Sequence, residues 1–323
     1  MGRAILERPL VSVIVPAYGV ADLLGEALSS LQAQRWPHWE AIVVDDGAPD
    51  DVVGAFKPFA GDPRFRLLRT DNGGLATARN RGVSASRAPY IALLDGDDIY
   101  EPDYLERMVA TLQMDHRLGF VSCDATMFGV RPYAGHRYSE RYPLGGPVTL
   151  DRVLSRDVQI VVSATIRRKA LEQVGGFDGS LRSVEDLDLW IRLLAAGWRG
   201  EIVPRPLVRY RRRAGSLSTN DRGMLTAACA VYRKACVALQ GRPEAATAAR
   251  TLMRYEMLLR YLDGEEAILN GDVERGLSLL AGAETRSPRW RLALPIMRRA
   301  PWLAASMLRM RAVTPRSRAW MFG

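Results

Sequence analysis

The sequence predicts an α/β fold in which a mostly parallel sheet is flanked by helices and followed by an all-helical extension. Over the first half of the chain, short apolar runs alternate with amphipathic segments, as strands alternate with crossover helices in a parallel sheet. Several of these runs are apolar at nearly every position, which is typical of strands that are covered on both faces. After residue 220 the pattern becomes almost wholly helical.

The elements of the first part follow in order along the chain. We expect strands at residues 10–15, 41–44, 65–68, 90–94 and 120–123, and helices at 21–34, 51–59, 75–86 and 102–114. Residues 131–147 are rich in Gly, Pro, Tyr and Arg without a clear period, which predicts a long surface loop. Beyond it we expect a strand at 160–166, a short helix at 168–174 and a longer helix at 184–196.

The last third of the chain predicts helices only, at residues 225–239, 244–262, 265–269 and 273–281. These helices would form at least two antiparallel pairs, and no period repeats three times. We therefore expect three parts: an α/β domain at 1–220, a helical extension at 221–284 and a basic tail at 285–323.

The net charge of +9 is concentrated in the tail, because residues 285–323 hold nine arginines and no acid. Interleaved with these arginines are apolar residues that would suit an anionic lipid surface: Trp290, Trp302, Leu303, Met307, Leu308 and Trp320. A compositional bias explains the charge equally well, since the chain holds 42 arginines and only three lysines. Nucleic acid is not an expected partner, because the sequence holds no reading motif.

Cysteine content and hydropathy predict the compartment. The three cysteines, Cys123, Cys229 and Cys236, are odd in number and lack metal-ligand spacing, which favours reduced thiols. The sequence contains no apolar run of the roughly 20 residues that span a bilayer, and its first ten residues hold no signal core. We therefore expect a cytoplasmic protein, with peripheral contact to the inner face of the membrane as an alternative.

Polar residues follow three of the predicted strands. The carboxyl ends of parallel strands form the ligand-binding edge of an open α/β sheet. Asp95, Asp97 and Asp98 follow the fourth strand, and three carboxylates so close together repel one another unless a cation lies between them. Mg²⁺ or Mn²⁺ fits such a site best, because these ions combine one or two carboxylates with substrate phosphates. The alternative is a solvated turn.

The second strand ends in Asp45, Asp46 and Gly47, where a carboxylate can accept a hydrogen bond from a nucleobase or a ribose hydroxyl, or can simply form a turn. Further along, Gly73 and Gly74 precede a helix that contains Arg79 and Asn80. Flexible glycines followed by basic residues at the start of a helix suit a diphosphate, although Gly-Gly is also common in loops.

Glu185 and Asp186 form the remaining acidic cluster, at the start of the helix predicted for 184–196. Either carboxylate can serve as a general base on a rigid element. In the structural alternative, Ser183 caps the helix and Asp186 completes a capping box. We expect the neighbouring Asp188 to face solvent.

Six motifs in order resemble the inverting family 2 glycosyltransferases of the GT-A fold, over residues 9–220. They are Val11-Ser12-Val13-Ile14-Val15-Pro16-Ala17-Tyr18, Val44-Asp45-Asp46-Gly47, Asn72-Gly73-Gly74 with Ala78-Arg79-Asn80-Arg81-Gly82, Leu94-Asp95-Gly96-Asp97-Asp98, Gly176-Phe177-Asp178 and Glu185-Asp186. The resemblance implies transfer of a hexosyl or N-acetylhexosaminyl group from a nucleotide diphosphate donor, with a UDP-sugar favoured. The acceptor would be a hydroxyl of a glycan or of a lipid-linked molecule, in bacterial surface-polysaccharide synthesis.

The resemblance also assigns roles to individual residues. It implies nucleoside contacts at Pro16, Ala17, Tyr18 and Asp46. Asp95 and Asp97 match the Asp-X-Asp motif that binds Mn²⁺ or Mg²⁺, and Asp97 is the expected direct ligand. Asp186 matches the catalytic base of the Glu-Asp pair.

Two positions depart from the family pattern. Gly19 stands where the family usually has Asn, and Arg213 stands where many members have a His that can approach the metal or the diphosphate. Arginine cannot ligate a metal but can pair with phosphate, so Arg213 is a candidate donor contact. In the structural alternative, the run Arg211-Arg212-Arg213 is an exposed strand edge kept soluble by its charge. The competing function is a catalytically silent nucleotide- or glycan-binding scaffold whose helical extension binds partners. A nucleotidyltransferase is not supported, because no Gly-rich basic segment follows the first strand.

Overall fold

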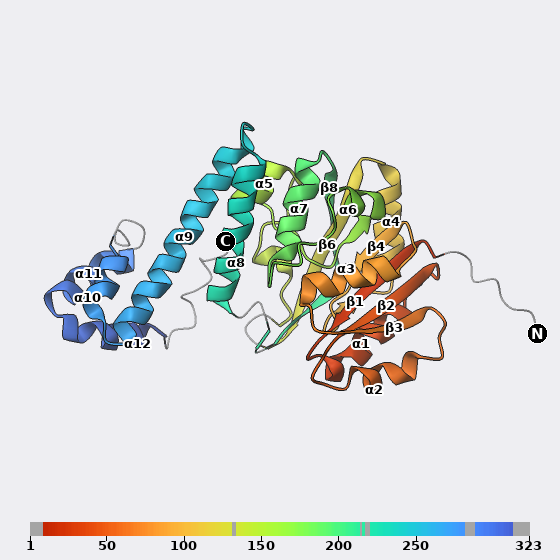
Figure 1. Cartoon of the computed structure of the whole chain (residues 1–323), viewed down its shortest axis with the longest axis horizontal. Coiled ribbons are helices and arrows are strands. Elements are labelled where there is room, and N and C mark those ends of the chain that lie inside the picture. Colours follow the sequence, from red (N-terminus) through yellow and green to blue (C-terminus); the bar gives the residue numbers. More distant parts are fainter. Residues whose placement is uncertain (1–8, 131–133, 214, 217–219, 282–287, 313–323) are drawn as a thin grey trace, which may run out of the picture. The chain divides into compact units, whose positions relative to one another are not determined.

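The computed structural model describes residues 9–130, 134–213, 215–216, 220–281 and 288–312. The chain divides into two compact units, Met1–Thr219 and Asn220–Gly323. The first unit is a sheet flanked by helices, and the described part of the second is helical (Figure 1). The α/β fold with a helical extension is thus confirmed.

The first unit is built on a mixed eight-stranded sheet with the strand order β3-β2-β1-β4-β7-β6-β8-β5. The strands are β1 Val11–Ala17, β2 Trp39–Asp46, β3 Phe65–Thr70, β4 Tyr90–Leu93, β5 Ile99–Tyr100, β6 Leu118–Gly129, β7 Thr165–Arg167 and β8 Arg199–Arg212. Strands β1 to β4 pair in parallel, as do β6 and β8, whereas β7 is antiparallel to both neighbours and β5 to β8. The parallel strands β1, β2 and β4 end at one edge, where the candidate site lies.

Three parts of the sheet differ from the expectation. The short strand β5 was not expected. The strand expected at 160–166 forms only as β7, and Ile160 and Val161 are buried outside it. Strand β8 was expected only as a strand edge at its arginine run, since Pro204 and Pro206 cannot donate the hydrogen bonds that pair strands. The structure accommodates them with register shifts against β6 between Cys123 and Ala125.

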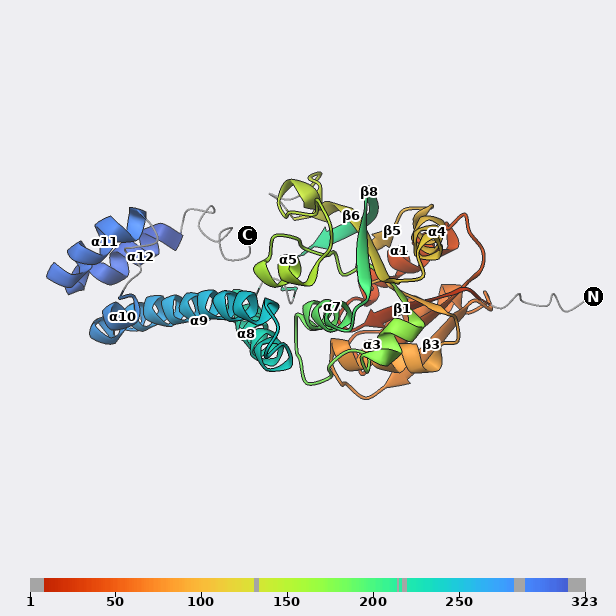
Figure 2. The ribbon, with the colours of Figure 1, turned by 90° about the horizontal axis from the view of Figure 1, so that it is seen from above.

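Helices cover both faces of the sheet (Figure 2). One face carries α1 Ala21–Gln32, α2 Val52–Phe56 and α4 Tyr104–Met114, and the other carries α3 Leu75–Ala85 and α7 Glu185–Ala195. The unit also contains the short helices α5 Leu150–Ser155 and α6 Arg168–Gln173. The helices expected in the first part therefore form, with ends that differ by a few residues.

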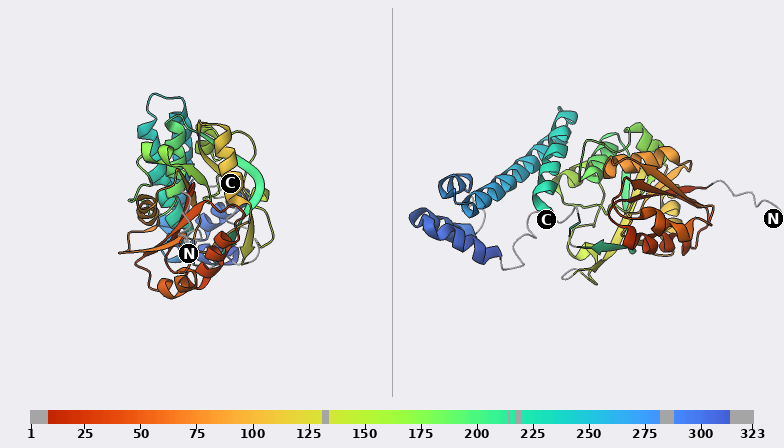
Figure 3. Two further views of the ribbon diagram at one scale, coloured as in Figure 1. Left: turned by 90° about the vertical axis from the view of Figure 1, so that its right-hand side faces the viewer. Right: turned by 60° about the horizontal axis from the view of Figure 1, so that its bottom comes forward.

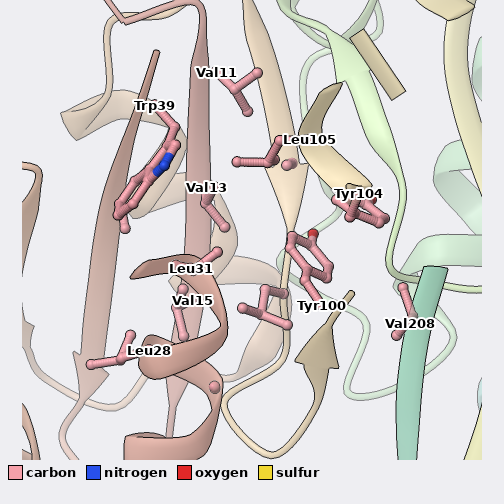
Figure 4. Close-up of a cluster of buried hydrophobic side chains, with 14 of the residues drawn as sticks. Val11, Val13, Val15, Leu28, Leu31, Trp39, Tyr100, Tyr104, Leu105 and Val208 are labelled. Atoms are coloured by element: carbon pink, nitrogen blue, oxygen red, sulfur yellow. The ribbon is translucent and has the colours of Figure 1, made fainter. Parts of the chain in front are cut away.

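A large hydrophobic core includes side chains of α1 and α4 (Figure 4). Alternate residues of β1, namely Val11, Val13 and Val15, point to this face because side chains alternate along a strand. They are buried together with Leu28 and Leu31 of α1. Each such aliphatic side chain contributes about 1.5–3 kcal/mol on burial.

On the opposite face, α3 lies unusually close to the sheet. A Cβ atom added to Gly82 would be 2.5 Å from Cγ2 of Ile14 and 3.1 Å from Cγ2 of Val44. The glycine therefore permits a close helix–strand approach, which fixes the helix that carries Arg79 and Asn80 directly against β1 and β2.

The second unit consists of α8 Asp221–Ala238, α9 Glu244–Leu269, α10 Val273–Leu279, α11 Pro288–Arg299 and α12 Ala304–Ala312 (Figure 3). The break expected after residue 262 is absent from α9, which continues through Gly264. Gly264 instead packs on α10, where an added Cβ atom would lie 3.0 Å from the carbonyl oxygen of Gly276. A glycine inside a helical pattern here marks a close helix–helix contact.

Helices α11 and α12 share a small core with α9 and α10. Its buried members are Tyr261, Ile268, Leu280, Leu294, Met297, Ala304 and Leu308. The expectation that Leu308 faces lipid is therefore wrong, because the inner side of α12 is used for packing. Trp320 lies outside the described residues. Among the helices of the described ranges, none is both long and apolar enough to cross a membrane.

Candidate active site

Pro16 and Ala17 are the last residues of β1 and lie at the edge of the sheet. Tyr18 follows them with an exposed side chain. Gly19 then adopts the left-handed conformation with φ +64°. Its departure from the family's Asn is conservative, because Asn tolerates this conformation better than most residues. The side chain of Asp50, which sequence analysis missed, accepts hydrogen bonds from the amides of Gly19 at 2.9 Å and Ala21 at 2.6 Å.

Burial alone would raise the pKa of Asp50, but the hydrogen bonds from Ala21 and Gly19 outweigh it and lower the pKa. The loop after β1 is therefore held by an ionised carboxylate from the segment after β2.

Asp46, at the end of β2, is buried and accepts hydrogen bonds from the loop before α3. Its two carboxylate oxygens lie 3.0 Å from the amide of Gly73 and 2.8 Å from the amide of Gly74. Arg81 also donates to it at 3.2 Å. The structure thus brings Asp46 and Gly74 together, with Gly74 at φ +83°. The nucleoside contact implied for Asp46 stays a prediction.

Arg79 connects the two acidic motifs. Its side chain is 1% exposed, Nη2 lies 2.6 Å from Oδ1 of Asp95, and Nη1 donates to Oε1 of Glu185. Burial alone would lower the pKa of Arg79, but the charges of Asp95 and Glu185 raise it above its ordinary value, so the guanidinium stays charged. Arg79 therefore joins the end of β4 to the start of α7.

Asn80 holds the turn that precedes α7. Its amide donates to the carbonyl of Phe177 at 2.7 Å and accepts from the amide of Phe177 at 2.9 Å. Gly176 has φ +74°, and an added Cβ atom there would lie 2.7 Å from Oδ1 of Asn80. Arg192 of α7 donates to the carbonyl of Gly176 at 2.8 Å. The structure therefore places Asn80 in a positioning contact, and direct donor binding by it stays a prediction.

The acids after β4 are balanced by arginines from β8 and the residue that follows it. Arg213 Nε lies 2.8 Å from Oδ2 of Asp97, while the amide of Arg211 donates to Oδ1 of Asp98 at 2.8 Å. Asp98 is fully buried, and its Oδ2 has no hydrogen-bond partner within the described chain. Burial raises the pKa of Asp97, with a further contribution from Asp95, and Arg213 only partly opposes it.

Glu185 and Asp186 begin α7. The residue before them, Val184, has φ +53°, an uncommon conformation for a β-branched residue. Glu185 is buried against Arg79, whereas Asp186 is half-buried and accepts from the amide of Leu187 at 2.8 Å. Burial raises the pKa of both carboxyls, although Arg79 opposes the shift. Asp186 is the more accessible of the two acids.

The structural alternative for the start of this helix does not form, and one expectation about the helix is wrong. Val184 rather than Ser183 occupies the N-cap position and no side chain caps the helix, so the capping box is absent. Asp188 does not face solvent but is buried, and its Oδ2 accepts from Arg192 Nε at 2.7 Å. The helix buries this face because Arg192 also binds the carbonyls of Val174 and Gly176.

The residues fit a divalent metal only together with a substrate. Among the described residues, no group of three or more His, Cys, Asp or Glu side chains is arranged to hold an ion. Asp95 and Asp97 nevertheless offer carboxylate oxygens whose negative charges repel each other. Mg²⁺ and Mn²⁺ commonly take one or two carboxylates and complete their coordination with phosphates and water, so this pair is chemically suitable.

The model of the family described as "Glycosyl transferase family 2" matches residues 12–175, half of the chain. The chain belongs to this family. The match covers the candidate residues from Pro16 to Asp97, whereas Glu185, Asp186 and Arg213 lie beyond it.

Similar sequences include TuaG of Bacillus subtilis, whose name assigns it to teichuronic acid biosynthesis. It is 28% identical over 232 residues, which cover 70% of this chain and 88% of TuaG. The succinoglycan biosynthesis protein ExoO of Rhizobium meliloti is 34% identical over 227 residues, covering 67% of this chain and 64% of ExoO.

Two solved structures have the same fold. Residues 1–349 of TarS from S. aureus, in complex with UDP-GlcNAc, give a TM-score of 0.64 at 17% identity, covering 94% of this chain and 91% of that one. The mannosyltransferase PcManGT of Pyrobaculum calidifontis, in complex with GDP-Man and Mn²⁺, gives 0.62 at 21% identity, covering 97% and 83%. The GT-A fold is thereby confirmed.

Proposed function

We propose that this glycosyltransferase moves a sugar from a nucleotide diphosphate donor, with a UDP-sugar favoured, to a hydroxyl of a glycan or lipid-linked acceptor in surface-polysaccharide synthesis. The observation that carries the proposal is the Arg79 bridge, which places the acid motif after β4 next to the acid pair of α7. The names of TuaG and ExoO support the polysaccharide assignment, and the ligands of TarS and PcManGT support a nucleotide-sugar donor.

Asp186 is the proposed general base, with inversion at the anomeric carbon. Its half-buried carboxylate is accessible, whereas Glu185 is occupied by Arg79. Asp186 removes the proton from the acceptor hydroxyl while the hydroxyl oxygen bonds to the anomeric carbon. The bond between that carbon and the phosphate oxygen breaks, and its electron pair leaves with the nucleoside diphosphate. A well-placed general base contributes roughly 10²–10⁴-fold to the rate.

Donor binding is assigned to the sheet edge. Pro16, Ala17, Tyr18 and Asp46 would contact the nucleoside, and Gly74 would contact the diphosphate. Asp95 and Asp97 would hold Mn²⁺ or Mg²⁺, which when bound offsets negative charge on the diphosphate. Arg213 already lies beside Asp97, and its guanidinium fork can pair with phosphate oxygens. Arg79 would then position Asp95 and Glu185, and Asn80 would position the turn at Phe177.

A thermal-shift panel of nucleoside diphosphates and nucleotide sugars, with and without Mn²⁺, tests the proposal, because a ligand that binds only the folded state raises Tm. We expect one nucleotide to stabilise the protein and the metal to strengthen the effect. Hydrolysis of that donor in the absence of acceptor then separates an enzyme from a silent scaffold. A folded protein that responds to no nucleotide would contradict the proposal.

A further inference from the structure

The segment from α11 to α12 exposes large apolar side chains that are not part of the core of the helical unit. Leu292 and Ile296 of α11 are 74% and 46% exposed, and Trp302, in the short helical turn Pro301–Leu303, is 78% exposed. The inward residues of the same segment already fill the core that it shares with α9 and α10. We call the three exposed residues Leu292, Ile296 and Trp302 the apolar surface.

The spacing of Leu292 and Ile296 makes these two residues neighbours on one side of a helix. Leu292 and Ile296 are four positions apart, so they lie on the same side of α11 one turn from each other. Trp302 follows the end of α11 by three residues. Large apolar side chains that group on a surface, rather than scatter singly, mark an interaction site.

The segment that carries the apolar surface holds basic side chains and no acidic ones. Residues 285–323 hold nine arginines and no acid, and four of those arginines are exposed among the described residues: Arg291, Arg298, Arg299 and Arg309. A partner must therefore combine dense negative charge with an apolar interior.

We propose that the apolar surface and its arginines bind an anionic lipid bilayer, with the helix lying in the plane of the headgroups. Tryptophan and aliphatic side chains enter the boundary between headgroups and acyl chains, while arginines pair with lipid phosphates. Nucleic acid would match the charge, but it offers no apolar interior for Leu292 and Ile296. A bilayer satisfies both features at once.

The inference goes beyond the proposed transferase reaction and does not depend on it. A protein held at a membrane would share that surface with lipid-linked acceptors, but lipid binding is measured without any sugar donor. Loss of catalysis with retained lipid binding, or the reverse, separates the two proposals.

Cosedimentation of the full chain with vesicles tests the inference. One set of vesicles contains phosphatidylcholine alone and the other also contains phosphatidylglycerol. We expect binding to the anionic vesicles only, with a strong decrease at high salt because surface charges are screened. The combined variant Leu292→Ser, Ile296→Ser and Trp302→Ser should weaken binding at least about tenfold. Arg299→Glu with Arg309→Glu should weaken it by a similar factor.

The matched control replaces exposed apolar residues elsewhere in the helical unit. Val237 of α8 and Met253 of α9 are 77% and 68% exposed, so Val237→Ser with Met253→Ser removes exposed apolar side chains that lie outside the apolar surface. This control should bind as the unchanged chain does. Melting curves verify that every variant is folded.

Fluorescence gives a second readout, because tryptophan emission should shift to shorter wavelength on anionic vesicles and the shift should be smaller in Trp302→Phe. Equal binding by the apolar-surface variant and its control would overturn the proposal. Absence of binding to anionic vesicles by the folded, unchanged chain would overturn it as well.

Discussion

The acids at the end of β2 and those that surround Arg79 differ in what neutralises them. Asp46 accepts from two backbone amides of the loop at Gly73 and Gly74 and from Arg81, whose side chain is 35% exposed. Asp95 and Glu185 are instead held by one arginine with a 1% exposed side chain. Both regions lie at the carboxyl edge of the sheet, but only the second combines buried charges from elements far apart in the sequence.

The contacts at Asp46 mainly fix the position of a loop, whereas the contacts around Arg79 balance buried charges. Amide donors fix a loop without adding a full charge. Buried arginines add full charges whose balance changes when an anionic ligand or a cation arrives. The region around Arg79 is therefore the more sensitive of the two, and the following changes test that contrast.

The largest effect is expected from Asp186→Asn, which keeps the shape of the side chain and removes the proposed base. The turnover rate should fall roughly 10²–10⁴-fold with donor affinity unchanged. Steady-state kinetics together with donor titration measure both quantities. As a contrast, Asp46→Asn should weaken donor binding, because that carboxylate positions the Gly73–Gly74 loop. An equal loss of donor affinity in Asp186→Asn would remove Asp186 from the role of base.

Arg79→Met should destabilise the first unit by about 3–5 kcal/mol, since it leaves Asp95 and the buried Glu185 without their cation. The matched control is Arg69→Met, which removes an exposed arginine from Asp45 at the end of β2. That change should cost less than about 1 kcal/mol. Denaturant unfolding measures both values. Similar losses for the two variants would show that the contrast drawn here is wrong.

Asp97→Asn should weaken metal-stimulated turnover by roughly 10–100-fold, because one of two proposed carboxylate ligands is lost. Turnover is measured across a titration of Mn²⁺. Asp103→Asn serves as control, since Asp103 pairs with Arg107 at the start of α4 and has no proposed role at the site. Near-normal turnover of Asp97→Asn at saturating metal would refute the assignment.

The pH dependence should follow the raised pKa of Asp186, which burial causes although Arg79 opposes it. A base works only when ionised, so activity should be lost as the pH falls through a value above the ordinary 3.8 of an aspartic acid. For stability the sign is opposite: the folded state binds this proton more tightly than the unfolded one, so this group's contribution becomes less favourable as pH rises through that window. Profiles of kcat and of unfolding midpoint against pH report the two effects. An acid limb centred at or below 3.8 would contradict the expectation.

The smallest effect is expected from Gly19→Asn, which restores the residue that the family usually has. Of the described residues, none has an atom within 4 Å of a Cβ atom at this position, and Asn tolerates the left-handed conformation. The melting temperature should change little. Gly82→Ala, by contrast, places a methyl group against Ile14 and should cost about 1–3 kcal/mol.

Much of the fold could be predicted because burial on both faces leaves a clear mark on parallel strands. The apolar runs of β1 and β2 are examples, and both are buried along their whole length. Strand β8 could be predicted only as a strand edge at its final arginines, since Pro204 and Pro206 before them resemble a loop. Its long pairing with β6 is what defines it as a strand.

The site residues at strand ends could be predicted from the sequence. The contacts between motifs far apart in the sequence could not. Asp46 and Asp95 follow strands, so their gathering at one edge follows from the fold. The contact between Arg79 and Glu185 joins residues 106 positions apart, and no local pattern encodes it. Asp188 was misplaced for the same reason, because its burial depends on the turn at Gly176.

The backbone strain at Val184 lowers the thermal stability of the protein. A β-branched residue in the left-handed conformation costs of the order of 1–3 kcal/mol, and it stands directly before the two acids of α7. Selection for thermal resistance in the laboratory should therefore find Val184→Gly or Val184→Asn early, because either residue relieves the strain. The costly residue stands at the point where the backbone turns into the proposed catalytic helix.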